Sequence, residues 1–104
     1  MMRVSAGIVR YPDGRILICR RGEGRKNAHL WEFPGGKQEA GESPEDALRR
    51  ELLEELSLPI ADISPLCRRE AQDITFDFLT AAATRAPVLT EHEDYALVHP
   101  AEMT

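Results

Sequence analysis

Acidic side chains on one predicted helix are the residues of this chain best suited to chemistry. Glu51, Glu54 and Glu55 stand at positions i, i+3 and i+4, so on a helix their Cβ atoms share one face at roughly 5–6 Å. Three carboxylates at that spacing repel one another unless a cation lies between them. Because the group offers oxygen ligands and no His or Cys, it suits Mg²⁺ or Mn²⁺ far better than Zn²⁺.

A solvated helix face is the alternative interpretation of these acids. Most Glu-rich helices point such side chains to water, and Arg49 and Arg50 could balance the charge by pairing along the helix. The helix alone leaves metal binding and a solvated surface equally open. A calcium-binding EF-hand loop fits less well, since the chain lacks that loop's order of acids, Gly and a distal Glu.

Start and stop signals flank the acidic helix. Ser43 is a suitable N-cap, and Pro44 suits the first helical position because its missing N–H would be unpaired there in any case. Pro59 prevents the helix from continuing. The opposite side of the helix is apolar and predicts a buried stripe of leucines: Leu48, Leu52, Leu53 and Leu56.

The spacing across the whole segment is more specific than the helix. The fixed positions of this pattern are, in order, Gly36, Glu42, Arg50, Glu51, Leu52, Glu54, Glu55, Ser57 and Leu58. This order resembles the Nudix box, G-x5-E-x7-R-E-U-x-E-E-x-G-U with U aliphatic. Only Ser57 departs, where the family has Gly. That position ends the helix and often requires a left-handed backbone, which costs Ser about 1 kcal/mol.

The resemblance implies a fold and an activity. Nudix domains are α/β proteins, alpha/beta/alpha sandwiches with a mixed central sheet, and they hydrolyse a nucleoside diphosphate linked to another group. The segment from Leu30 to Lys37 is similar to the one that precedes the box in MutT-type members. That similarity implies a nucleoside triphosphate pyrophosphohydrolase that sanitises the nucleotide pool, acting on oxidised or pyrimidine nucleotides and releasing a nucleoside monophosphate and pyrophosphate.

Two other functions stay open beside this one. The box is common to hydrolases of ADP-ribose and other nucleoside-diphosphate-linked compounds, so it does not choose between those substrates. A Nudix-like module that binds a nucleotide without cleaving it is the non-enzymatic alternative. Such modules typically lose box glutamates, whereas this chain keeps all of them.

The resemblance also assigns the metal site. In the family, the residues matching Glu51, Glu54 and Glu55 hold the divalent ions, and the last two are the strongest candidates here. The backbone carbonyl matching Gly35 often joins them. Glu91 resembles an additional acid on a later loop, and with Glu51 it is a candidate general base. A solvated loop acid is the alternative for Glu91.

Further roles carry over to basic residues. Arg50 resembles the box arginine that orients a glutamate through a salt bridge. Arg21 matches an arginine that contacts phosphate after the second strand, although an Arg at a strand end is often only solvated. Lys37 is the second predicted substrate-binding residue. Glu42 resembles the box acid at the helix entrance, with a structural or water-mediated metal role.

The elements that position these residues follow from turn and alternation patterns. Residues 11–14 form a predicted turn between two strands, and residues 22–29 form a polar loop near the site. Residues 34–36 are expected to turn the chain between two short strands. The predicted strands are residues 4–10, 15–20, 31–33, 37–38, 60–71, 74–83 and 95–98.

Aromatic and histidine side chains carry weaker signals. Trp31 and Phe33 fall on one face by alternation, which favours core packing for both. Phe76 and Phe78 likewise share a strand face, and the sequence does not decide which of these aromatics lines the pocket. The histidines are dispersed without metal-ligand spacing, which predicts surface or packing roles for His29, His92 and His99.

Composition bounds the partners and the compartment. The 104 residues are expected to form a single domain over 1–104, and the net charge of −5 argues against binding a nucleic-acid polymer. A small nucleotide carried in with a cation is compatible with that charge. Two cysteines, no apolar leader and no run of roughly 20 apolar residues predict a cytoplasmic chain without membrane contact. The oligomeric state is left undetermined.

The last residues raise a question about the pocket. Residues 99–103 predict the first turn of a helix just before the sequence ends. MutT-type relatives usually carry a longer C-terminal segment there, with a helix that helps to form the base pocket. The resemblance therefore implies either a truncated form that lacks the usual C-terminal helix or a pocket that is more open than usual.

Overall fold

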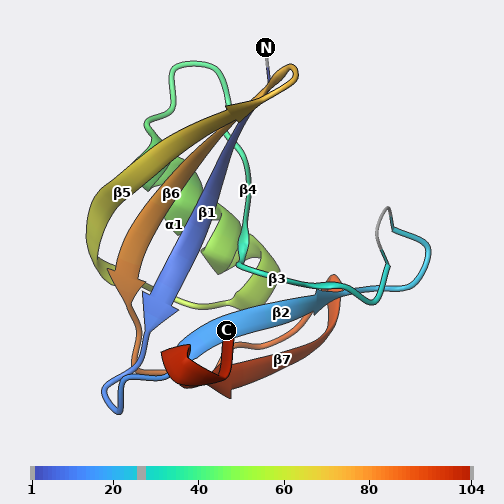
Figure 1. Ribbon diagram of the computed structural model, residues 1–104, viewed down its shortest axis with the longest axis vertical. Coiled ribbons are helices and arrows are strands. Elements are labelled where there is room, and N and C mark those ends of the chain that lie inside the picture. Colours follow the sequence, from blue (N-terminus) through green and yellow to red (C-terminus); the bar gives the residue numbers. More distant parts are fainter. Residues whose placement is uncertain (1, 26–27, 104) are drawn as a thin grey trace.

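The computed structural model describes residues 2–25 and 28–103. These residues contain seven strands, one α-helix and one short 3₁₀ helix (Figure 1). The predicted loop at 22–29 therefore lies partly outside the described residues. The strands are β1 (Met2–Arg10), β2 (Ile16–Arg21), β3 (Trp31–Glu32), β4 (Gly35–Lys37), β5 (Ala61–Ala71), β6 (Ile74–Ala82) and β7 (His92–Val98). Each predicted strand is found, but β1, β4 and β7 begin earlier than the sequence indicated.

The sheet is mixed, as predicted. Its main order is β3-β2-β1-β6-β5, while β4 pairs with β1 and β7 pairs with β2. Strands β1 and β6 run parallel from Met2↔Ile74 to Arg10↔Ala82. The other pairs are antiparallel. Long-range parallel pairing thus joins the start of the chain to its second half.

Two limbs arise because β1 and β2 separate directly after their shared turn. They meet in register only at Arg10↔Ile16. The rest of the β1 edge pairs with β4, from Val4↔Lys37 to Ala6↔Gly35. One limb therefore holds β4, β1, β6 and β5, and the other holds β3, β2 and β7 (Figure 1).

The prediction that 34–36 only turn the chain is wrong, because Gly35 and Gly36 belong to strand β4. A Cβ atom on Gly35 would lie 1.9 Å from the Ser5 carbonyl oxygen. Only glycine allows the two backbones to approach so closely. The glycine that opens this strand thus sets β4 tightly against β1.

Helix α1 spans Pro44–Leu56 and has the ends that the sequence predicted. Ser43 is the N-cap, and its Oγ accepts a hydrogen bond from the Asp46 N–H at 3.1 Å. Ser57 ends the helix at φ 48° and ψ 36°, in the left-handed region. Its N–H donates to the Leu53 carbonyl at 3.1 Å. The position where the family carries Gly therefore does require the conformation that Gly tolerates best.

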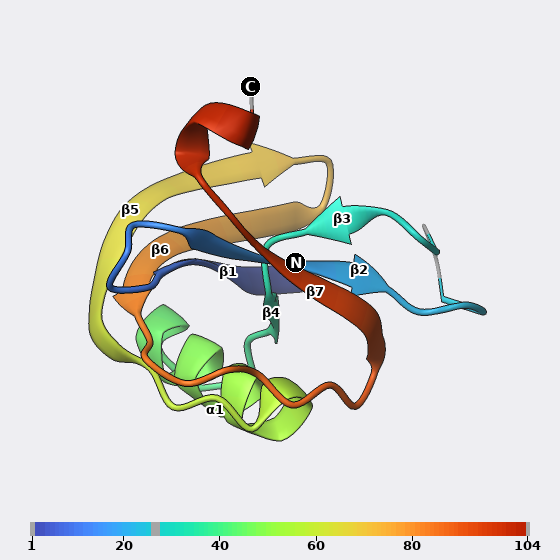
Figure 2. The same ribbon diagram turned by 90° about the horizontal axis from the view of Figure 1, so that it is seen from below.

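The core lies between α1 and the sheet (Figure 2). Leu48, Leu52 and Leu56 are fully buried there, but Leu53 is 48% exposed, so its predicted place in the apolar stripe is wrong. Each residue turns the helix by about 100°, which places position 53 well away from the direction of 48 and 52. The buried stripe of the helix therefore contains fewer leucines than the sequence predicted.

The opposite side of the sheet carries little helix. The short 3₁₀ helix η1 (Pro100–Met103) lies on the side away from α1 (Figure 2). Within residues 2–25 and 28–103, α1 is the only α-helix. None of the described helices is long and apolar enough to cross a membrane.

Candidate active site

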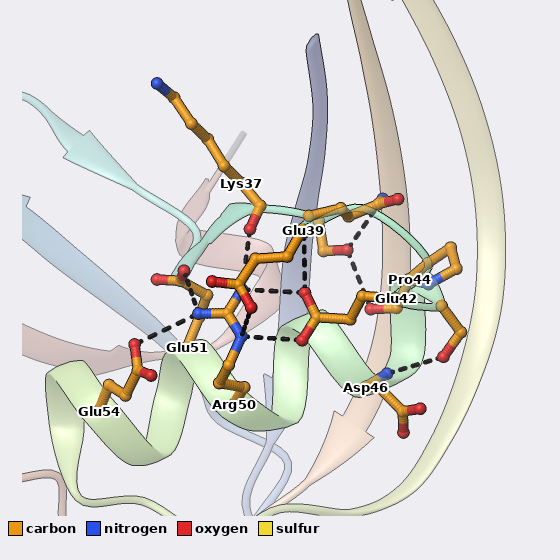
Figure 3. A network of polar contacts seen from close by, with 11 residues as sticks. Lys37, Glu39, Glu42, Pro44, Asp46, Arg50, Glu51 and Glu54 are labelled. Carbon is orange, nitrogen blue, oxygen red and sulfur yellow. Dashed lines mark hydrogen bonds and ion pairs between the residues drawn. The ribbon is translucent and has the colours of Figure 1, made fainter.

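Arg50 is the centre of an ion-pair network on the acidic face of α1 (Figure 3). Its Nε and Nη2 donate to the two carboxylate oxygens of Glu42 at 2.8 and 2.9 Å. Its Nη1 donates to Glu51 at 2.9 Å and to Glu54 at 3.3 Å. Its Nη2 also donates to the Lys37 carbonyl at 3.0 Å, which ties the helix to β4. One guanidinium thus fixes three of the box acids.

This pairing favours the charged form of Glu42. The hydrogen bonds from Arg50, helped by one from the Glu39 backbone, lower the pKa of Glu42 to about 2. A planar guanidinium is suited to this role because it binds a carboxylate through two parallel N–H groups. The contact joins the loop before α1 to the middle of the helix.

A cavity of about 740 Å³ opens beside this network. Most of the residues that line it are apolar, acidic or basic. Its apolar wall includes Val4, Ala6, Phe33, Ile74, Phe76 and Phe78. Its acidic side chains include Glu51, Glu55 and Glu91, and its basic side chains are Arg21, Arg25 and Lys37. The rings of Phe76 and Phe78 stack with centroids 6.2 Å apart. The cavity therefore joins an apolar surface to a strongly charged end.

The acids of the cavity crowd around Glu55. Burial raises the pKa of Glu55 to about 8, and a hydrogen bond to Glu91 and the charge of Glu51 add to the effect. Glu91 comes from the segment before β7, and the neighbouring Thr90 hydroxyl donates to the Glu55 carbonyl at 2.7 Å. Glu55 therefore holds a proton near neutral pH, and a bound cation would compete with that proton.

The burial of Glu55 follows from helix geometry. Position i+7 returns to within about 20° of position i in a helix of 3.6 residues per turn. Glu55 therefore points in nearly the direction of Leu48, which is fully buried. Its carboxylate enters the edge of the core face, whereas Glu54 lies 60% exposed beside Arg50. Adjacent acids in the sequence thus have very different surroundings.

Glycine makes room for Glu51 in the same way. A Cβ atom on Gly36 would lie 2.4 Å from the Glu51 Oε2 atom. The carboxylate therefore packs directly on the backbone of β4, with its other oxygen held by Arg50. Gly35, the next residue toward the N-terminus, also lines the cavity.

The donor set fits a hard divalent cation. It consists of carboxylate oxygens, and their mutual repulsion would fall when a cation binds. Within the described residues, no group of three acidic, His or Cys side chains is already arranged as a metal site. Mg²⁺ does not need one, because it is usually held by one or two carboxylates together with waters and substrate phosphates.

The basic side of the cavity contains residues that the sequence did not reveal. Arg21 Nη1 donates to Glu32 at 2.9 Å, and His92 Nε2 lies 3.4 Å from the other oxygen of Glu32. Arg25 pairs with Glu91 at 3.5 Å. The packing role predicted for His92 agrees with its burial, but Glu32, His92 and Arg25 all line the cavity. Only the proximity of Glu32 to the box could have signalled its place.

The structure brings most predicted site residues together, with two differences. Glu54 is not among the residues that line the cavity, and its exposed carboxylate contacts Arg50 at 3.3 Å. The Lys37 side chain points away from the Arg50 network (Figure 3). Among the aromatics, Trp31 is 44% exposed, so its predicted core position is wrong, because strand β3 ends after Glu32 at the side of the sheet. Phe33 instead lines the cavity.

Known proteins are similar to this chain in sequence and in fold. The chain is 36% identical over 102 residues to the CTP pyrophosphohydrolase of Escherichia coli, covering 94% of this chain and 74% of that protein. It is 50% identical over 58 residues to the 8-oxo-dGTP diphosphatase of Haemophilus influenzae, covering 56% of this chain and 43% of that enzyme. The corresponding E. coli diphosphatase is matched over 44% of its length. The chain thus spans less than half of these two diphosphatases.

A solved MutT structure, from a study of the Aliivibrio salmonicida and Vibrio cholerae proteins, superposes with a TM-score of 0.83 and 32% identity. The superposition covers 98% of this chain and 82% of that one. It confirms the Nudix-type fold that the box implied. The family model of the NUDIX domain matches residues 1–103. Since the match extends over nearly the whole chain, from the strands of both limbs to the acidic helix, this protein belongs to the NUDIX domain family.

Proposed function

We propose that this protein hydrolyses nucleoside triphosphates to nucleoside monophosphate and pyrophosphate with the help of Mg²⁺ or Mn²⁺. Removal of oxidised or pyrimidine nucleotides from the nucleotide pool is the matching cellular role. The observation that carries the proposal is one cavity with crowded carboxylates at one end and an apolar wall at the other. Such a cavity has a place for a cation with phosphates and a place for a base.

The metal ligands we propose are Glu51, Glu54, Glu55 and Glu91, with the carbonyl of Gly35. Glu51 and Glu55 already line the cavity from the helix, and Glu91 approaches Glu55 from the opposite segment. A bound divalent cation supplies charge neutralisation at phosphorus and activation of the attacking water. Glu54 would join the set by turning from its exposed contact with Arg50.

The protein's own residues would orient the reaction. Arg50 is a positioning residue, since it holds Glu51 through a 2.9 Å contact. Glu51 and Glu91 are the two candidate general bases, because both border the charged end of the cavity. Arg21 and Lys37 would contact phosphate oxygens as cations. The base would lie against the stacked rings of Phe76 and Phe78.

A triphosphate fits this cavity better than a linked diphosphate. Three cationic side chains, Arg21, Arg25 and Lys37, belong to residues that line it. A longer polyphosphate can engage more of them at once. The names of the relatives point the same way, since they refer to CTP and to 8-oxo-dGTP.

Product analysis tests the proposal. The purified protein is incubated with Mg²⁺, Mn²⁺ or a chelator and with ordinary and oxidised nucleoside triphosphates, ADP-ribose and a dinucleoside polyphosphate. Monophosphate plus pyrophosphate, formed only with metal, is the expected result. Cleavage confined to ADP-ribose or the dinucleotide would contradict the triphosphate assignment. The absence of cleavage for every compound would contradict the hydrolase assignment.

A matched pair of variants links the activity to the cavity. Glu55→Gln removes a carboxylate inside the cavity, and Glu45→Gln makes the same change in the first turn of the same helix. The first variant should lose turnover and the second should keep it. Equal rates in the two variants would place the reaction elsewhere.

A further inference from the structure

Glu32 joins two cavity residues that lie far apart in the sequence. Its Oε1 atom accepts a hydrogen bond from Arg21 Nη1 at 2.9 Å, and its Oε2 atom lies 3.4 Å from His92 Nε2. Each carboxylate oxygen thus has a different partner, and the side chain is held from both sides. All three residues line the cavity. The motif that defines the acidic helix includes none of them.

A β-bulge creates this arrangement. Strands β2 and β7 pair at Arg20↔Asp94 and then at Arg21↔His92, so Glu93 is the extra residue of β7. A bulge redirects the side chains around it and is common beside active sites. Here it places His92 opposite Arg21 at the cavity. Strand β3 brings Glu32 to the same end through the pair Cys19↔Glu32.

The extra residue of the bulge points to a separate cluster. Glu93 accepts from His29 Nδ1 at 2.5 Å and pairs with Arg20 Nε at 3.2 Å. None of these three residues is among those that line the cavity. The bulge therefore separates two glutamates: Glu32 makes its contacts at the cavity, and Glu93 makes its contacts outside it.

Burial and charge make the Glu32 contacts strong. The His92 side chain is only 8% exposed, and its Nδ1 atom is buried without a hydrogen-bond partner among the described residues. Burial alone would raise the pKa of Glu32, but hydrogen bonds from His92 and Arg21 hold this pKa below its usual value. Glu32 therefore stays charged between its two partners, where charge-assisted hydrogen bonds restrict side-chain motion most.

We propose that Glu32 is a positioning residue that holds the Arg21 guanidinium in the cavity for the polyphosphate of the substrate, with His92 fixing Glu32 in turn. The inference rests on the proposed function, because it deepens the role of the phosphate end of that cavity. A long Arg side chain loses conformational freedom when it binds a phosphate. An arginine that is already held binds with a smaller entropic cost.

A double-mutant cycle with Arg21 tests this role. Glu32→Gln keeps the shape of the side chain and removes its charge. We expect it to raise KM for the triphosphate about tenfold and to change kcat less than about threefold, since the loss falls on binding. In an Arg21→Ala background, the same change should alter KM less than about twofold. Equal KM effects in both backgrounds would overturn the proposal.

The cycle also distinguishes a positioning role of Glu32 from competition between Glu32 and phosphate for Arg21. If Glu32 instead competed with phosphate for Arg21, Glu32→Gln would lower KM, and that result would overturn the proposal. Glu93→Gln is the matched control, because it breaks comparable contacts with Arg20 and His29 outside the cavity. We expect its KM to stay within about twofold of the parent value. A KM increase as large as that of Glu32→Gln would show a general loosening of the strand ends and would overturn the proposal.

Binding measurements separate this proposal from the proposed function. If the wild-type protein cleaves no compound of the panel, the proposed function fails. The same cycle is then measured as the Kd of a non-hydrolysable triphosphate analogue by titration calorimetry. Glu32→Gln should weaken that binding only when Arg21 is present. Thermal unfolding of each variant confirms that it is folded.

Discussion

Two glutamates of the same box motif have opposite electrostatic surroundings. Glu42 lies against Arg50, which lowers its pKa to about 2. Glu55 lies half-buried between Glu51 and Glu91, and its pKa is raised to about 8. The first carboxylate stabilises the folded chain by its charge, whereas the charge of the second destabilises the metal-free fold.

The difference indicates a division of labour along the acidic segment. Acids that pair with Arg50 join the loop, the helix and β4 into one rigid unit. The acids that crowd around Glu55 lack such a counter-charge and keep a place where a cation is favoured. Proteins often carry local instability at the site that performs the function.

Removal of a carboxylate that is a proposed metal ligand should have the largest effect on activity. Glu55→Gln and Glu54→Gln should each lower kcat by roughly two to three orders of magnitude, because each removes charge that a metal ion needs. Steady-state rates at saturating Mg²⁺ measure this loss. A rate near the wild-type value for Glu54→Gln would restrict the ligands to the acids that already line the cavity.

Disruption of the ion pairs of Arg50 should have a smaller effect on activity. Arg50→Lys keeps the positive charge but cannot bind both oxygens of Glu42 in parallel. We expect kcat/KM to fall about 10- to 100-fold, as is typical when a residue that orients metal ligands is changed. The midpoint of the Mg²⁺ titration should rise as well. An unchanged midpoint would show that Arg50 serves folding alone.

A rise in pH from 4.5 to 8 should reveal the unfavourable surroundings of the Glu55 charge. Its folded-state pKa of about 8 exceeds the ordinary value of 4.5, so the metal-free fold loses stability as pH rises from 4.5 to 8. Glu55→Gln removes this loss. Its melting temperature without metal should therefore exceed that of the wild type, and the gap should widen between these pH values. A gap that narrows with rising pH would contradict the assignment.

Acidic pH should reveal the opposite contribution of Glu42. Its folded-state pKa of about 2 is below the ordinary 4.5, so its stabilising charge is fully present above pH 4.5 and is lost as pH falls toward 2. Urea unfolding across this range measures the loss. In Glu42→Gln, stability should be lower at neutral pH and should fall less steeply with acid. Parallel curves for the two proteins would refute the pairing.

The smallest expected effect concerns the end of the helix. Ser57 has a left-handed backbone at φ 48°, so Ser57→Gly should stabilise the fold by about 1 kcal/mol. Activity should be unchanged, since Ser57 is not among the residues that line the cavity. Denaturant unfolding checks the gain. A loss of stability would mean that the Ser side chain makes a contact worth more than the relief of strain.

The sequence predicted the helix of this site well because its signals are local. The cap at Ser43 and the left-handed turn at Ser57 depend on neighbouring residues, and both are found. Local patterns also predicted the strands, apart from the positions of their ends. Glycine is typical of turns, so the sequence predicts a turn at Gly35 and Gly36, whereas their role is to let β4 approach β1 and Glu51.

Other parts of the site were missed for two different reasons. A simple division of α1 into an apolar and an acidic face predicts a buried Leu53 and an exposed Glu55, but the turn of about 100° per residue leaves Leu53 exposed and Glu55 half-buried. The contact between Glu32 and His92 depends on the bulge in β7, which no local pattern indicated. The three-dimensional structure alone brings these residues to one cavity.

The most direct test of the account is the rate of pyrophosphate release from a nucleoside triphosphate as Mg²⁺ is varied, measured side by side for the wild type, Glu55→Gln and Glu45→Gln. A saturable Mg²⁺ dependence is expected for the wild type and Glu45→Gln. In Glu55→Gln, the rate should fall by roughly two to three orders of magnitude. Equal, metal-independent rates in all three proteins would contradict a cation site at the crowded acids.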